Sequence, residues 1–88
     1  MEKIILDGAK MTDKVAAHEH IAEMMGFPLW YGNNLDALWD MLSERDKAEI
    51  ELTATAAMLS ALGTYGCRLL SCFFDAAEEN PRIVFTVK

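Results

Sequence analysis

The chain has 88 residues, 52% of them hydrophobic and 25% charged, a balance that is typical of one globular domain and excludes a disordered chain. Its formal net charge of −6 argues against DNA, RNA or anionic lipid as a direct ligand and favours a basic partner. No apolar run approaches the ~20 residues of a membrane span, and the first residues do not form a signal peptide, so we expect a cytoplasmic protein.

The amino-terminal third predicts a strand and a helix. Lys3–Asp7 has a continuous apolar centre, which favours a strand covered on both faces. A helix follows from Thr12, its expected cap, to about Met25, and Gly26 is its expected end. Within it, His18 and His20 point about 200° apart and cannot share a metal ion, so we interpret both as solvated polar positions.

Residues 27–42 hold both tryptophans and predict a loop followed by a short helix. Gly32 and Asn33 supply turn chemistry, and Asn34 is a good N-cap for a helix that runs to about Ser43. The apolar positions of this helix recur at i, i+3 and i+7 and should share one buried face: Leu35, Leu38 and Leu42.

Two acids of the same helix stack on another face. Asp36 and Asp40 lie at i and i+4, about 6 Å apart, with Trp39 beside them. Asp36 gains from the helix dipole but Asp40 does not, and the two repel by roughly 0.2–0.5 kcal/mol. One interpretation is a solvated face. The other is a binding face that mimics neighbouring phosphates of a nucleic-acid strand, with aromatic side chains in place of bases.

The second half of the chain continues the alternation of helices and strands. Glu44–Lys47 is expected to be a solvated loop, and Ala48–Thr53 alternates with period two, which favours a short strand at a sheet edge. Gly63 separates two predicted helices, and Asn80-Pro81 ends the second. The remaining elements are predicted at Ala54–Leu62, about Tyr65–Glu79 and Arg82–Val87.

The element order implies an α/β fold. Helical crossovers between all strands require a parallel sheet with right-handed connections. We therefore predict one domain, residues 1–88, with a three-stranded parallel sheet packed with four helices. The N-terminal strand is the most apolar for its length, so we expect it to be central, with the strands near residues 50 and 84 on either side.

Cys67 and Cys72 predict neither a disulfide nor a metal site. They are five residues apart on a helix, so they point about 140° apart, and no CxxC spacing is present. We expect two free thiols and no cofactor.

An eleven-residue run resembles a known family. The run Trp30-Tyr31-Gly32-Asn33-Asn34-Leu35-Asp36-Ala37-Leu38-Trp39-Asp40 is similar to Tyr-Tyr-Gly-x-Asn-Leu-Asp-Ala-Leu-Trp-Asp of the barstar family, intracellular inhibitors of secreted bacterial ribonucleases. Over the rest of the chain the likeness lies in length and element order. The resemblance implies the same three-stranded parallel sheet, and we expect a monomer.

In that family the short helix and the preceding loop plug a ribonuclease active site lined with basic residues. By position, the resemblance implies that Asp40 occupies the phosphate pocket, that Asp36 pairs with a basic residue beside it, and that Trp30 lies against the catalytic histidine. Trp39 would pack beneath the rim, and Asp75 matches a peripheral acid. The implied partner-binding residues are Trp30, Tyr31, Gly32, Asn33, Asn34, Leu35, Asp36, Trp39, Asp40 and Asp75.

The rim of the implied interface departs from the family pattern. Trp30 lacks a tyrosine hydroxyl, Glu44-Arg45 stand where the best-known member has Gly-Trp, and Lys47 replaces an acid. The centre of the recognition face is kept while its rim has changed, which indicates a different cognate ribonuclease.

The chemistry of the sequence favours binding over catalysis. No nucleophile with a base, metal site or phosphate-binding glycine loop is visible. A glycosidase-like role for Asp36 and Asp40 would need a substrate cleft, for which a short helix of a small domain leaves little room. We predict a non-enzymatic inhibitor of a small, basic, barnase-like ribonuclease. The alternatives are a barstar-like binding module for another basic protein, and a scaffold whose acids only solubilise it.

Overall fold

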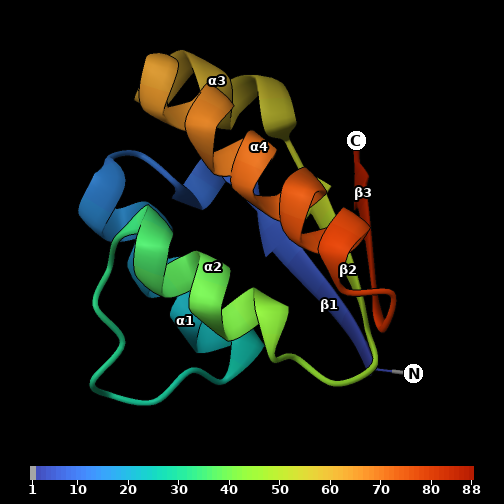
Figure 1. Ribbon diagram of the computed structural model, residues 1–88. Coiled ribbons are helices and arrows are strands. Elements are labelled where there is room, and N and C mark those ends of the chain that lie inside the picture. The colour runs from blue at the N-terminus through green and yellow to red at the C-terminus, as the bar shows by residue number, and fades with distance from the viewer. Residues whose placement is uncertain (1) are drawn as a thin grey trace.

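The structure, a computed structural model, describes residues 2–88 and confirms the predicted α/β order. It contains three strands, four α-helices and a short 3-10 helix that the sequence did not predict (Figure 1). In chain order these are β1 (Glu2–Asp7), η1 (Gly8–Lys10), α1 (Lys14–Met25), α2 (Leu35–Ser43), β2 (Ala48–Thr53), α3 (Thr55–Leu62), α4 (Thr64–Glu79) and β3 (Ile83–Val87).

The sheet is parallel, as predicted, but its strand order differs from the prediction. The order is β1-β2-β3, so β2 is central and β1 lies at an edge. Ile4 of β1 pairs with Ile50 of β2, which pairs in turn with Phe85 of β3. The expectation that the N-terminal strand is central, with the strand near residue 50 at an edge, is therefore wrong.

The strand order and the covering of the sheet have one physical cause. When right-handed crossovers advance from strand to strand in the same direction, they place all their helices on one face. Figure 1 shows the helices gathered on one side of the sheet. The other face is open, and Ile5 on it is 46% exposed, which overturns the expectation of a strand covered on both faces.

The open face also explains the alternating pattern of the central strand. Ala48, Ile50 and Leu52 are buried beneath the helices. Glu49 and Glu51 alternate with them on the other face, where Glu49 is half-buried and Glu51 is only 9% exposed. The Glu51 carboxylate forms an ion pair with Lys88, whose Nζ lies 2.8 Å from Glu51 Oε1. Alternation in this chain therefore reports a sheet with one open face, and it does not report an edge.

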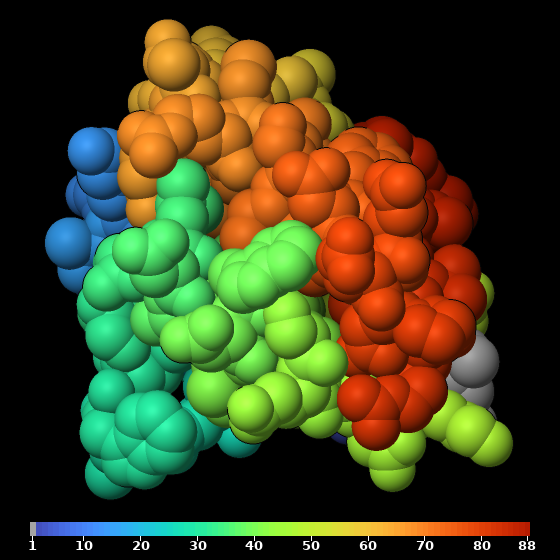
Figure 2. Space-filling view, in the orientation of Figure 1, coloured from blue at the N-terminus to red at the C-terminus, as the bar shows by residue number. Residues whose placement is uncertain are grey.

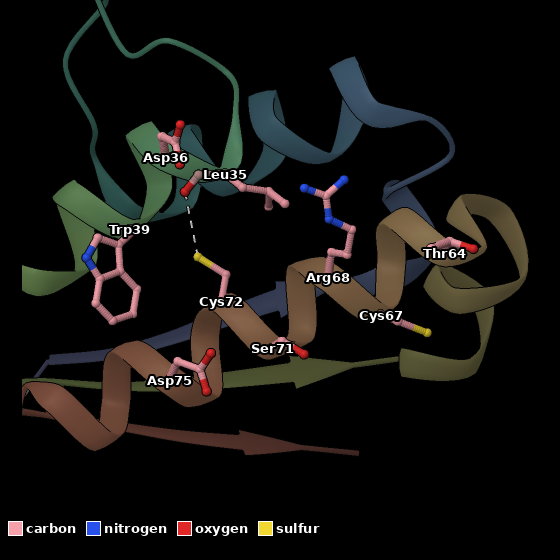
Figure 3. A pocket seen from close by; sticks show the side chains of 9 residues that line it. All are labelled: Leu35, Asp36, Trp39, Thr64, Cys67, Arg68, Ser71, Cys72 and Asp75. Carbon is pink, nitrogen blue, oxygen red and sulfur yellow. Dashed lines mark hydrogen bonds between the residues drawn. The ribbon is translucent and has the colours of Figure 1, made fainter.

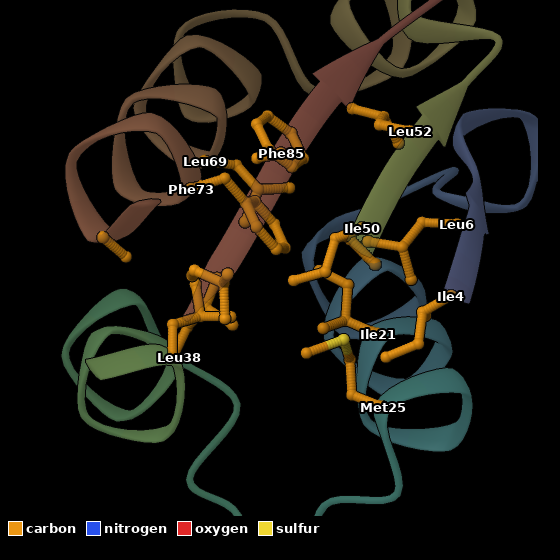
Figure 4. Close-up of a cluster of buried hydrophobic side chains, with 14 of the residues drawn as sticks. Ile4, Leu6, Ile21, Met25, Leu38, Ile50, Leu52, Leu69, Phe73 and Phe85 are labelled. Carbon is orange, nitrogen blue, oxygen red and sulfur yellow. The ribbon is translucent and has the colours of Figure 1, made fainter. Parts of the chain in front are cut away.

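The core lies between the covered face of the sheet and the helices (Figure 4). Phe73 of α4 stacks on Phe85 of β3, with ring centroids 4.7 Å apart. Leu38 and Leu42 of α2 are completely buried in the same core. Burial of one such leucine stabilises the fold by roughly 1.5–3 kcal/mol, so α2 is held firmly against the rest of the molecule.

Local signals determine where α1 begins and ends. Asp13 caps it, with its carboxylate accepting from the Ala16 backbone N–H at 2.7 Å, one residue after the predicted cap Thr12. Gly26 ends it in the left-handed conformation, with φ of 70°, and directs the chain into the loop before α2.

Within residues 2–88, no helix is long and apolar enough to cross a membrane.

Candidate partner-binding site

The loop before α2 has the turn chemistry that the sequence predicts. Asn33 adopts a positive φ of 52°, and the next residue, Asn34, caps the helix. The Asn34 side chain accepts from the Ala37 N–H at 2.8 Å and donates to the Gly32 carbonyl at 3.2 Å. These bonds define the point at which the loop ends and the acidic helix begins.

The outward side of α2 carries the two stacked acids. Asp36 and Asp40 are both exposed, whereas Leu38 and Leu42 on the inward side are fully buried. Leu35, predicted to be buried with them, is only half-buried, because it borders a groove beside α4. The carboxylates are therefore presented to solvent on a helix whose other side is fixed in the core.

Two adjacent aromatic residues of the loop, Trp30 and Tyr31, have opposite environments. Trp30 is 79% exposed and Leu29 beside it is fully exposed, which is unusual for adjacent large apolar side chains. Tyr31 is buried and packs on Phe27, with ring centroids 4.8 Å apart. Trp30 is therefore available to a partner, whereas Tyr31 anchors the loop.

A buried histidine fixes that anchor. His18 of α1 lies between two tyrosine hydroxyls: its Nδ1 is 2.8 Å from Tyr31 Oη and its Nε2 is 2.6 Å from Tyr65 Oη. Burial lowers the pKa of His18 and favours the neutral ring. His20 is also buried, and its Nε2 accepts from the Asp7 N–H at 2.9 Å. The interpretation of both histidines as solvated positions is therefore wrong.

A groove of about 430 Å³ runs between α2 and α4. Asp36 and Trp39 line it from α2, and Arg68, Cys72 and Asp75 line it from α4 (Figure 3). Segment 27–43 and α4, far apart in the sequence, lie side by side on this face of the molecule (Figure 2). The groove connects the acidic surface of α2 to α4. Of the α4 residues that line it, the sequence predicted only Asp75 as a partner-binding residue.

Cys72 lies between the two helices that form the groove. Its thiol donates a weak hydrogen bond to the Leu35 carbonyl over 3.8 Å. Burial, reinforced by the charges of Asp75 and Asp36, raises the pKa of Cys72 to about 11. The thiol therefore stays protonated at neutral pH, which makes it a weak nucleophile.

A second hollow, of about 530 Å³, lies on the other side of α2. Trp30 borders it from the loop, and Asp40 and Glu44 border it from the helix and its carboxyl end. The exposed indole and the second acid are thus placed beside one depression, large enough to receive a partner's side chain.

The connection after α2 is less solvated than its composition suggests. Arg45 donates from Nη1 to the Met25 carbonyl at 2.6 Å and forms an ion pair with Glu2 over 2.8 Å. Glu44 and Lys47 are exposed, as expected for rim positions. Arg45 therefore supports the fold, and only its neighbours are free to meet a partner.

Sequence reasoning assigned no role in this region to Arg68, nor to the buried contact of His18 with two tyrosines. Arg68 had a usable signal, because it lies four residues before Cys72 and seven before Asp75, spacings that share one helical face. The contact of His18 with Tyr31 and Tyr65 joins positions 13 and 47 residues away, and no local pattern indicates such a contact.

Comparison with known proteins agrees with this geometry. The family model described as Barstar (barnase inhibitor) matches residues 1–88. A protein of Bacillus subtilis (strain 168) named "Putative ribonuclease inhibitor YrdF" is 35% identical over 81 residues, which cover 90% of this chain and 89% of that protein. With a match over the full length and a relative of this identity, the chain belongs to the Barstar family.

Proposed function

We propose that this protein inhibits a small, basic, secreted ribonuclease by filling its RNA-binding cleft with α2 and the loop before it. The observation that carries the proposal is the pair of exposed acids, Asp36 and Asp40, stacked on the outward side of a helix that is fixed in the core. Membership of the Barstar family and the name of the Bacillus subtilis relative support the same role.

In this proposal each site residue has a distinct task. Asp40 takes the place of an RNA phosphate among the cations of the cleft, and Asp36 pairs with a basic residue beside it. Trp30 lies against the catalytic histidine of the ribonuclease, and Asp75 adds a contact from α4. The net charge of −6 accelerates the encounter with a basic partner through long-range attraction.

The proposed role is binding without catalysis, by a monomer in the cytoplasm. Asp36 and Asp40 are both exposed on α2, where they can enter a partner's cleft, and they line two different hollows, so they do not face each other across one substrate cleft. The two free thiols fit a reducing compartment.

The test is inhibition of RNA cleavage by barnase and by a panel of small basic bacterial ribonucleases. We expect at least one to be inhibited stoichiometrically. Asp40→Ala should weaken that binding by about 2–5 kcal/mol, mainly through faster dissociation, because the partner's cations are left buried and unpaired. Association should slow as salt rises, since attraction is screened beyond about 10 Å at 0.1 M ionic strength.

Two results would contradict the proposal. The first is a panel in which no ribonuclease binds. The second is a ribonuclease that binds at saturation and still cleaves RNA at its full rate. Capture of a basic protein that is not a ribonuclease, through the same acids, would instead favour a barstar-like module for another partner.

A further inference from the structure

Arg68 is a cation on an otherwise acidic binding face. It is exposed on α4 and lines the groove that also contains Asp36 and Asp75. It lines a second, smaller hollow as well, together with Asn34 and Tyr65 at the amino-terminal ends of α2 and α4. Figure 3 shows Arg68 rising from α4 beside Leu35 of α2, with Asp75 farther along the same helix.

The charge of Arg68 is not used within the fold. The two ion pairs of residues 2–88 are Arg45–Glu2 and Lys88–Glu51, and no hydrogen bond of the Arg68 guanidinium to these residues is formed. Asp36 lines the same groove, yet neither it nor Asp75 forms an ion pair with Arg68. The guanidinium therefore keeps its donors available to a partner.

Attraction of a basic ribonuclease does not explain the positive charge of Arg68 on this face. A basic ribonuclease is repelled by every positive charge on the face that it approaches, and like charges brought together in an interface oppose binding strongly. The charge order along the groove, positive at Arg68 and negative at Asp36 and Asp75, requires the reverse order in the partner. The guanidinium is also suited to bidentate pairing with a carboxylate.

We propose that Arg68 is a specificity-determining residue, which selects a ribonuclease that presents a carboxylate beside the cations that meet Asp36 and Asp75. This inference rests on the proposed function and adds to it a chemical requirement on the partner. Ribonucleases with only cations at that position are rejected by Arg68, since binding would bring two positive charges together.

The experiment measures association and dissociation rates against the ribonuclease found in the panel, with barnase included. The variants are Arg68→Ala, Arg68→Glu and, as a matched control, Lys3→Ala, which removes one positive charge from the open face of the sheet. We expect Arg68→Ala to weaken binding at least tenfold through faster dissociation, and Arg68→Glu to weaken it at least a hundredfold. Lys3→Ala should change the affinity less than twofold.

The sign of the effect decides the matter. If Arg68 has no carboxylate partner, its removal makes the inhibitor more acidic, so Arg68→Ala should bind a basic ribonuclease equally well or more tightly, and the inference is overturned. If binding weakens, carboxylates of the ribonuclease are neutralised one at a time. One of them must abolish the effect of Arg68→Ala, and the assignment fails if none does.

Failure of this inference is distinct from failure of the proposed function. When the wild-type protein binds a ribonuclease, Asp40→Ala disrupts the complex and Arg68→Ala does not, only the role of Arg68 is wrong. When no ribonuclease of the panel is bound, both are wrong. Arg68 is exposed, so its variants should unfold at the wild-type temperature, which a thermal melt verifies.

Discussion

The two sides of α2 differ in what they contribute to the molecule. The inward side places Leu38 and Leu42, both fully buried, in the core. The outward side stacks Asp36 and Asp40, which are exposed, form no ion pair with residues 2–88 and repel each other. The inward side stabilises the fold far more than the outward side does, and the proposed basic partner would account for the pair of acids.

The largest effect on stability should come from the inward side. Leu38→Ala should lower the free energy of unfolding by about 2–5 kcal/mol, because it opens a cavity in a closed core. Urea denaturation monitored by fluorescence of the two tryptophans measures this change. Leu35→Ala is the control, with a smaller loss because Leu35 is only half-buried. Equal, small losses for both variants would show that α2 is not held by its inward side.

The second-largest loss of stability should come from removing the contact that anchors the loop before α2. Tyr31→Phe removes the hydroxyl that meets His18 Nδ1 and leaves that buried nitrogen without its partner, which should lower the free energy of unfolding by about 1–3 kcal/mol. Hydrogen exchange of residues 27–34 should accelerate as the loop loosens. The idea fails if Tyr31→Phe unfolds at the wild-type urea concentration.

His18 and the second buried histidine, His20, give the stability of the fold a pH dependence of definite sign. Burial lowers the pKa of His18, and burial and Lys10 lower that of His20, so the unfolded chain binds these protons more readily than the folded one. Stability should be full above about pH 6.5, the ordinary histidine value, and should fall as pH decreases below it. Urea midpoints between pH 7.5 and 5 measure this. A profile that stays flat, or rises toward acid, would contradict the neutral state.

The smallest effect on stability should come from the outward side. Asp40→Ala relieves like-charge repulsion and should raise the free energy of unfolding by roughly 0.2–0.5 kcal/mol. Asp36→Ala should leave it nearly unchanged, since relief of repulsion offsets loss of a favourable charge in the first turn. High salt should diminish both differences. A clear destabilisation by Asp40→Ala would mean that this acid supports the fold.

Local sequence patterns predicted the helices and strands, but they did not predict the strand order or the contacts between distant segments. Asn34 as a cap, Gly26 as a helix end and the leucine spacing of α2 are short-range features, and the structure confirms the caps and two of the three leucines. Strand order was wrong because Ile5 suggested a strand covered on both faces, although it lies on an open face. Arg68 was readable from helical spacing, but its position beside α2 depends on packing between distant segments.

We propose that the outward side of α2 serves binding and not folding. The most direct measurement is the affinity of the Asp40→Ala variant for the ribonuclease that the wild-type protein inhibits. The variant and the wild type are compared without urea, where both are fully folded. We predict a loss of about 2–5 kcal/mol in binding with no loss in unfolding free energy. Unchanged affinity, or a loss of affinity that merely follows a loss of stability, would contradict the account.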